Sequence, residues 1–122
     1  MSERHWGPYV RDMLDCCEAI RGYAAGLDRA TFFATRILYD AVLWNLTVLG
    51  EASTRLPESV KEAHQEIPWY AITGTRNRVV HGYPAIREDT IWKVIQDDIP
   101  ELMPLLRALL EEAEKEGGAD PP

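Results

Sequence analysis

Residues 35–55, TRILYDAVLWNLTVLGEASTR, repeat apolar side chains at intervals of three and four positions. This spacing places the apolar residues on one face, so the segment is predicted to form a long amphipathic helix. Its core face is expected to carry Ile37, Ala41, Val42, Val48, Leu49 and Ala52. The helix is expected to end at Leu56-Pro57, because proline cannot continue the helical hydrogen-bond ladder.

Two polar residues of this helix have alternative interpretations. Asn45 interrupts the apolar stripe, either as a hydrogen-bonded core amide or as a polar group aimed at a functional site. The structural interpretation is favoured, because buried amides are usually satisfied within the protein. Glu51 lies close to Asn45 along the helix, where it would either pair with a site arginine or sit at the edge of the core. A structural role is favoured for Glu51 as well, and both residues are kept as possible support for a site.

On the N-terminal side, the same spacing predicts a second helix with one buried stripe. The stripe consists of Val10, Met13, Leu14, Cys17, Ile20 and Ala24. Pro8 suits the first turn of this helix, and Gly26 suits its end. Asp28 is then placed to cap a short helix before Phe32 and Phe33.

On the C-terminal side, residues 57–64 are expected to form one or two helical turns. Pro68 then opens a helix that carries Trp69, Ile72, Val79 and Val80. This helix should end near His81, because glycine is a natural residue just past a helix end and a proline follows soon after.

A last helical region is predicted from about Asp89 to Lys115, kinked or divided by Pro100 and Pro104. No segment of the sequence shows the alternating pattern of a strand. The chain is therefore expected to be all-α, an up-and-down bundle of four or five helices. The bundle would form one domain over residues 1–116, and residues 117–122 would form a disordered tail.

The charge of the chain argues against general binding of nucleic acids. Its 122 residues carry a formal net charge of −7, whereas such proteins usually have a basic footprint. The distribution is uneven, however, because no acidic residue occurs between Ile67 and Arg87. A locally positive site on an acidic body is therefore possible.

Other parts of the sequence exclude several classes of protein. No apolar run approaches the roughly 20 residues needed to cross a bilayer, and the N-terminus does not resemble a signal peptide. The adjacent Cys16 and Cys17 are expected to be reduced thiols in a cytoplasm. The three histidines are scattered and the cysteines lack zinc-type spacing, so no metal site is expected. His5 and His64 are not expected to take part in catalysis.

The segment Arg76-Asn77-Arg78-Val79-Val80-His81-Gly82-Tyr83 concentrates groups that suit work on phosphodiesters. Arginine is a permanent, forked binder of phosphate. Histidine titrates near neutral pH and can both take and give a proton. Asn77 and His81 are four residues apart, on one face of the predicted helix, and Tyr83 adds a hydroxyl that could be modified.

Other nearby residues are assigned weaker roles. Arg78 and Arg87 are interpreted as solvated surface charges, although either could contact an RNA backbone. Trp69 and Trp92 are interpreted as core or dimer-interface aromatics.

With these residues in view, the chain resembles the HEPN superfamily and, within it, the HepT-like branch of small bacterial and archaeal toxins. The motif is similar to that branch's Arg-x4-His-x-Tyr signature, here Arg76, His81 and Tyr83, with Asn77 at the usual polar position. The resemblance extends to residues 40–46, 50–52, 67–69 and 98–102, and covers nearly the whole chain up to about Leu110.

This resemblance implies a helical homodimer whose facing motifs form a shared ribonuclease site that uses no metal or other cofactor. Arg76, Asn77 and His81 would be the catalytic residues, and the substrate would be messenger RNA or tRNA. The resemblance also implies a toxin–antitoxin pair of type II or VII. Its antitoxin would be a minimal, MntA-like nucleotidyltransferase that neutralises the toxin by transferring AMP to Tyr83.

A different class of function stays open. HEPN-type domains also serve as non-catalytic nucleotide-binding or partner-docking subunits, on the antitoxin side of a nucleotidyltransferase pair. The complete set Arg76, Asn77, His81 and Tyr83 favours the enzyme.

Overall fold

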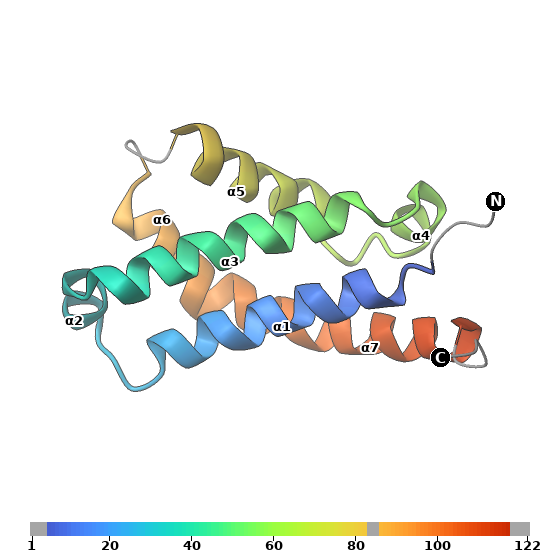
Figure 1. Ribbon diagram of the computed structural model, residues 1–122, viewed down its shortest axis with the longest axis horizontal. Coiled ribbons are helices and arrows are strands. Elements are labelled where there is room, and N and C mark those ends of the chain that lie inside the picture. The colour runs from blue at the N-terminus through green and yellow to red at the C-terminus, as the bar shows by residue number, and fades with distance from the viewer. Residues whose placement is uncertain (1–4, 83–85, 118–122) are drawn as a thin grey trace.

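The computed structural model describes residues 5–82 and 86–117, and within these residues all regular structure is helical (Figure 1). The prediction of an all-α fold is therefore confirmed for the part of the chain that is described. The elements are α1 (Gly7–Ala24), α2 (Arg29–Ala34), α3 (Arg36–Thr54), α4 (Glu58–Ala63), α5 (Trp69–Gly82), α6 (Glu88–Lys93), the π-helical turn η2 (Val94–Asp98) and α7 (Ile99–Gly117). Most of the predicted tail, residues 118–122, lies outside the described residues.

Three long helices form the centre of the molecule. Helix α1 packs against both α3 and α7, and the chain direction alternates along α1, α3, α5 and α7 (Figure 1). The core between them consists of fully buried side chains, among them Val10, Met13, Ile20, Val42, Leu46, Leu106 and Leu109. Helix α5 packs against α3 (Figure 1), and its buried Ile72 and Val79 belong to the same hydrophobic core. None of the helices in the described ranges is long and apolar enough to span a bilayer.

The predicted end of the first helix and the predicted start of the second are confirmed. Helix α1 ends at Ala24, and Gly26 has a φ of 75°, a left-handed conformation that favours glycine. The Asp28 carboxylate then accepts a hydrogen bond of 2.8 Å from the backbone N–H of Thr31. This bond caps α2 and lowers the pKa of Asp28.

The predicted core face of α3 is partly wrong. Ile37 is 79% exposed, and the buried side chains of this helix are Val42, Leu46, Leu49, Ala52 and Ser53. Helix α3 carries apolar residues around most of its circumference, so periodicity alone does not select the face that α1 covers. The exposed apolar residues of α3 lie on a second face of the helix.

The last helical region is divided, but not only by its prolines. The break is the π-helical turn Val94–Asp98, which ends two residues before Pro100, whereas Pro104 lies inside α7. Pro100 has no N–H to donate to the preceding turn. The Arg21 side chain donates to the Ile95 carbonyl at 3.1 Å, so a hydrogen bond from α1 stabilises the widened turn.

Both cysteines are free thiols in the core, although the sequence pattern places only Cys17 on the buried stripe. Burial raises the pKa of Cys16 from 9.0 to about 11 and that of Cys17 to about 12. We expect Cys16 to react with a disulfide reagent at pH 8 at least about 100-fold more slowly in native protein than in denaturant, because a thiol pKa of about 11 in place of 9.0 lowers the thiolate fraction by that factor. Absorbance kinetics give both rates, and equal rates would contradict the burial.

Candidate functional site

Helix α5 carries the motif and approaches α3 very closely. The Ile72 N–H donates to the Pro68 carbonyl at 3.0 Å, so the helix begins directly after the proline as predicted. Ile72 and Val79 are buried toward the bundle. At the crossing, an ideal Cβ on Gly50 of α3 would lie 2.2 Å from the Cβ and 2.6 Å from the Cγ of Arg76. Glycine at position 50 is therefore what allows the arginine to sit there.

The Arg76 guanidinium is held by two neighbours. Its Nη2 lies 2.5 Å from Glu51 Oε1, and its Nη1 donates to Asn77 Oδ1 at 2.8 Å. The Arg76 side chain is only 26% exposed, and its Nε is buried without a hydrogen-bond partner. The structure thus brings Arg76, Asn77 and Glu51 together, with Glu51 fixing the arginine from the neighbouring helix.

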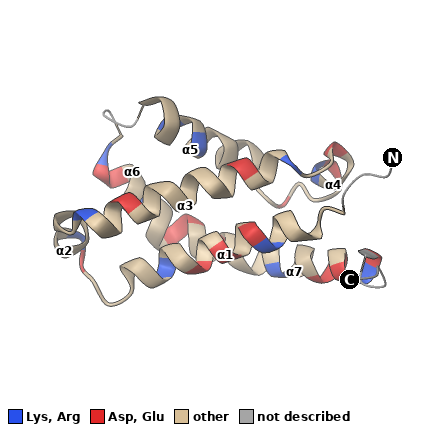
Figure 2. Cartoon of the chain, in the orientation of Figure 1, with Lys and Arg blue, Asp and Glu red and all other residues tan. Residues whose placement is uncertain are grey.

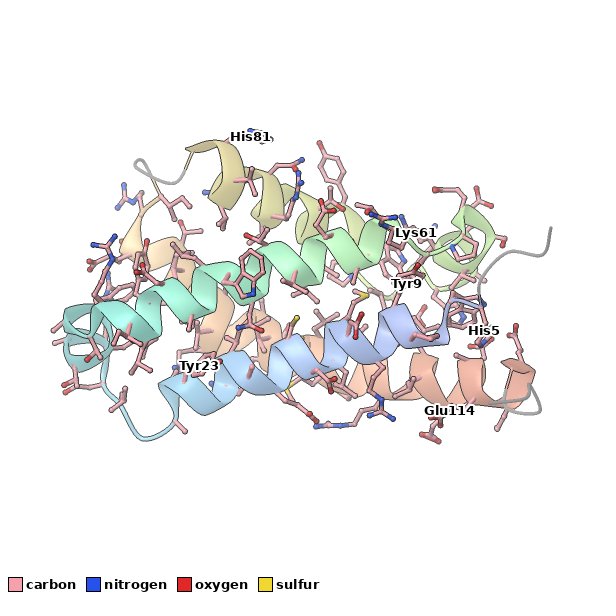
Figure 3. The ribbon with its side chains drawn as sticks, in the orientation of Figure 1. His5, Tyr9, Tyr23, Lys61, His81 and Glu114 are labelled. Carbon is pink, nitrogen blue, oxygen red and sulfur yellow. The ribbon has the colours of Figure 1, made fainter. Side chains whose placement is uncertain are left out.

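His81 points in a different direction. It lies on the outer side of α5 and projects away from the bundle (Figure 3). Its side chain is exposed and makes no hydrogen bond to another described residue. It lies five positions after Arg76 in the sequence, which corresponds to about 140° around a helix. One copy of the chain therefore presents its arginine and its histidine on different sides of α5.

The remaining predicted site residues are placed less centrally. Asn45 donates to the Ala41 carbonyl at 2.9 Å within its own helix, so it makes the structural hydrogen bond expected of an amide near the core. Arg87 lies 3.2 Å from Asp89, which also binds Arg29. These two arginines, Arg29 foremost, lower the pKa of Asp89. Tyr83 lies outside the described residues.

The model of the family described as "Ribonuclease HepT-like" matches residues 13–109 of this sequence. The chain belongs to the HepT-like family. A protein of Caldanaerobacter subterraneus subsp. tengcongensis, provisionally named an RNase, is 31% identical over 104 residues, which are 85% of this chain and 93% of that protein. A probable ribonuclease HepT of Thermococcus cleftensis is 30% identical over 94 residues, 77% of this chain and 86% of that protein. No solved structure matches the chain.

Sequence reasoning missed two features of this HepT-like site. The first is Gly50, because its role depends on a helix crossing that local patterns do not reveal. The second is a stripe on α3 that consists of Ile37, Trp44 and Glu51, spaced by seven residues and hence on one face. Ile37 is 79% exposed and Trp44 is 66% exposed. The α3 stripe therefore places two exposed apolar side chains on the same face as the Glu51 carboxylate, which pairs with Arg76.

The HepT-like motif helix is also distinctive in charge. Helix α5 carries basic but no acidic residues, whereas α1, α3 and α7 carry both signs (Figure 2). Arg78 is exposed and forms no ion pair within the described residues. No group of three His, Cys, Asp or Glu side chains in the described ranges could hold a metal ion.

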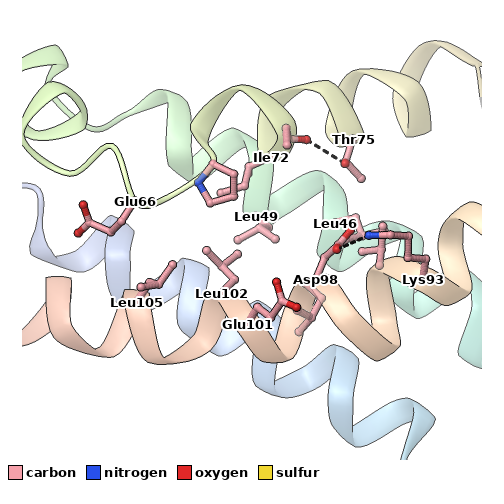
Figure 4. Close-up of a pocket in the computed structure, with 14 residues that line it drawn as sticks. Leu46, Leu49, Glu66, Ile72, Thr75, Lys93, Asp98, Glu101, Leu102 and Leu105 are labelled. Atoms are coloured by element: carbon pink, nitrogen blue, oxygen red, sulfur yellow. Dashed lines mark hydrogen bonds and ion pairs between the residues drawn. The ribbon is translucent and has the colours of Figure 1, made fainter.

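An apolar hollow lies on the other flank of α5. It has a volume of about 460 Å³ and lies between α5, η2 and α7 (Figure 4). Leu46, Leu49, Ile72 and Leu102 give it an apolar floor. No residue of the Arg76–His81 motif lines it. The hollow is therefore separate from the motif chemistry.

The other histidines and tryptophans hold elements together. His64 lies between Glu66, 3.2 Å from Nδ1, and Glu112, 2.9 Å from Nε2, and thereby joins the start of α5 to α7. Trp69 donates to the His64 carbonyl at 3.0 Å. His5 contacts the Ala113 carbonyl at 3.0 Å, and Trp92 packs on Phe32 and Phe33.

We expect the Glu51–Arg76 pair to contribute a coupling free energy of about 0.5–1 kcal/mol to folding, since both side chains are partly screened by solvent. A double-mutant cycle with Glu51→Ala and Arg76→Met, followed by urea denaturation, measures it. The more exposed Arg11–Glu114 pair, at 3.7 Å, is the control and should give a smaller value. Equal coupling in both pairs would mean that Glu51 does not hold Arg76.

Proposed function

We propose that this HepT-like chain is a metal-independent endoribonuclease whose site is completed by a second copy of the chain. The observation that carries the proposal is the arrangement on α5, where Glu51 fixes Arg76 on one side and His81 is free on the other. Relatives that cover most of the chain are named as ribonucleases, which supports RNA as the substrate.

The α3 stripe supports a second copy as the partner. Exposed Trp44 and Ile37 are residues of the kind that interface cores favour. Because Glu51 continues the same stripe, a copy that covers Trp44 would lie next to Arg76. A two-fold dimer presents each patch twice, so two Arg76 and two His81 side chains would face one groove.

The proposed reaction uses the two histidines in different roles. One neutral His81 takes the proton of the ribose 2′-hydroxyl, whose oxygen attacks the adjacent phosphorus. The protonated His81 of the other copy gives a proton to the departing 5′-oxygen. The products are a 2′,3′-cyclic phosphate and a 5′-hydroxyl.

Arg76 would stabilise the charge of the phosphorane. Asn77 accepts a hydrogen bond from Nη1 and Glu51 forms an ion pair with Nη2, and the remaining N–H groups of these two nitrogens would bind the non-bridging oxygens. Asn77 is exposed beside them and would position the phosphate or ribose through neutral hydrogen bonds.

Cleavage of RNA in EDTA tests the proposal. We expect purified protein to cut a mixed-sequence, single-stranded RNA with EDTA present and to leave cyclic phosphate ends. Activity that appears only after Mg²⁺ is added, or products with 5′-phosphates, would overturn the proposal. Growth arrest on expression of this chain alone would separate a toxin from a docking subunit, for which arrest would come from the partner gene.

Mixing wild-type and His81→Ala chains tests the shared site. If each site needs both histidines, equal mixing with free exchange leaves about one quarter of the dimers active. Total cleavage should then be about a quarter of that of pure wild-type protein at the same total protein concentration. A linear dependence on the wild-type fraction would show that each chain acts alone. Recovery of untagged wild-type chains with affinity-tagged His81→Ala chains confirms that the two exchange.

We propose further that the chain is the toxin of a toxin–antitoxin pair and is switched off at Tyr83. A nucleotidyltransferase partner would join the tyrosine oxygen to the α-phosphorus of ATP and release pyrophosphate. The added adenylate would bring bulk and negative charge two residues from His81, where it would repel RNA phosphates. Incubation with ATP and the neighbouring nucleotidyltransferase should add AMP mass to the Tyr83 peptide and stop cleavage. Modification elsewhere would overturn this assignment.

A further inference from the structure

Four residues form a line along the outer face of α5. Tyr70, Gly74, Asn77 and His81 follow one another at intervals of four, three and four residues, so they share one side of the helix. Ile72 and Val79 are buried on the opposite side, against the bundle. This outer line therefore begins at Tyr70, about three helical turns before His81, and ends at His81.

Tyr70 is the most exposed large side chain of this line. It is 92% exposed, although it stands on an ordered helix, and its ring makes no aromatic contact with the described residues. An aromatic side chain normally gains most of its stabilisation from burial. Exposed rings on an ordered surface are also the platforms on which unpaired bases stack.

Gly74 has no role in packing within the chain. A glycine inside a helix is less stable than an alanine, and a Cβ at Gly74 would meet nothing within 4 Å. Gly50 is the contrasting case, because a Cβ there would collide with Arg76. A glycine that the chain itself does not require leaves room for the backbone of another molecule.

The surroundings of the outer line suit RNA. Residues 68–86 contain no carboxylate, and Arg78 is exposed beside the line with no ion pair to a described residue. Tyr70 and the carboxylates Glu58 and Glu62 of α4 border one shallow hollow, so the acid-free surface ends at Tyr70. Of the other exposed large apolar residues, Ile37 and Trp44 lie on α3, and Val80 lies on α5 outside the outer line.

We propose that Tyr70, Gly74 and Asn77 form a track for single-stranded RNA that ends at His81. A base stacks on the Tyr70 ring, the sugar-phosphate backbone passes over Gly74, and Asn77 hydrogen-bonds the nucleotide next to the cleaved bond. This track rests on the ribonuclease function proposed above and gives the site a preference for unpaired substrates longer than a dinucleotide.

Substitutions at Tyr70 test the stacking. The probe is a fluorescent, single-stranded RNA of mixed sequence, and its anisotropy gives a Kd for the full-length protein. Tyr70→Leu keeps apolar area but lacks the ring, so Kd should rise by roughly 5- to 150-fold, the range for loss of one stacked base. Tyr70→Phe should bind like wild type. An RNA with an abasic nucleotide at the stacked position should erase the difference between wild type and Tyr70→Leu.

Substitutions at Gly74 test the passage of the backbone, because stability and binding should change in opposite directions. Gly74→Leu should raise Tm, since its side chain enters open space on a helix, and should weaken RNA binding at least about 5-fold. Gly22→Leu is the matched control: a Cβ at this exposed α1 glycine also meets nothing within 4 Å. It should leave RNA binding unchanged.

The two proposals fail in different ways. If wild-type protein binds this RNA through Tyr70 and Gly74 but does not cut it, the ribonuclease proposal fails and the track stands. If cleavage occurs while Tyr70→Leu and Gly74→Leu bind RNA like wild type, the track is overturned. A shift of Gly74→Leu from dimer to monomer in sedimentation would also overturn it, because the glycine would then accommodate a second copy.

Discussion

Replacing His81 by alanine should lower RNA cleavage by about 10²- to 10⁴-fold, the usual contribution of general acid–base catalysis. The side chain is exposed and makes no hydrogen bond to the described residues, so its removal should leave the fold and Tm unchanged. Initial rates on a single-stranded RNA in EDTA, measured with equal amounts of folded protein, give the loss.

A matched control is available in the same chain. His5 contacts the Ala113 carbonyl at the far end of the bundle, so His5→Ala should retain full cleavage even if Tm falls slightly. Cleavage that survives in His81→Ala would remove histidine from the mechanism. His81→Gln is less informative, because glutamine can still donate a hydrogen bond to a phosphate.

Replacing Gly50 by alanine should destabilise the fold by about 1–3 kcal/mol, the usual range for overpacking. The added methyl carbon would lie 2.2 Å from the Arg76 Cβ, and neither atom is the end of a flexible side chain. Helix α5 must then move away from α3, which separates Arg76 from Glu51. Cleavage should therefore fall together with stability.

Gly22→Ala provides the comparison for Gly50→Ala. Its Cβ meets nothing within 4 Å, so the same chemical change should raise stability by roughly 0.5–1 kcal/mol. Urea denaturation of both variants gives the two free energies. A Gly50→Ala protein as stable as Gly22→Ala would mean that the two helices do not cross as closely as described.

Much of the helical arrangement follows from local sequence signals. The Asp28 cap, the end of α1 near Gly26 and the start of α5 after Pro68 all depend on residues that act on their immediate neighbours. The exposed position of Ile37 could not be predicted in this way. Its helix is apolar on two sides, and the packing of α1 and α5 decides which residues are buried.

In the candidate site, too, some features follow from the local sequence and others depend on contacts between helices. Arg76, Asn77 and His81 are predicted from the sequence as site residues, through their residue types and the family resemblance together. Local spacing cannot show that Glu51 holds Arg76, because that contact crosses between two helices. The five-position spacing does place the arginine and the histidine of one chain about 140° apart around a helix, which is the feature that supports the proposed second copy.

The two-sided character of α3 has a consequence for behaviour in a cell. Its buried residues stabilise the single chain, and its exposed Ile37 and Trp44 would act between chains in the proposed dimer. Folding and pairing would then depend on different residues of one helix. With a site shared between copies, activity at low abundance would rise with the square of the concentration. A few stray molecules would be nearly harmless, and damage would begin only once synthesis outpaced removal.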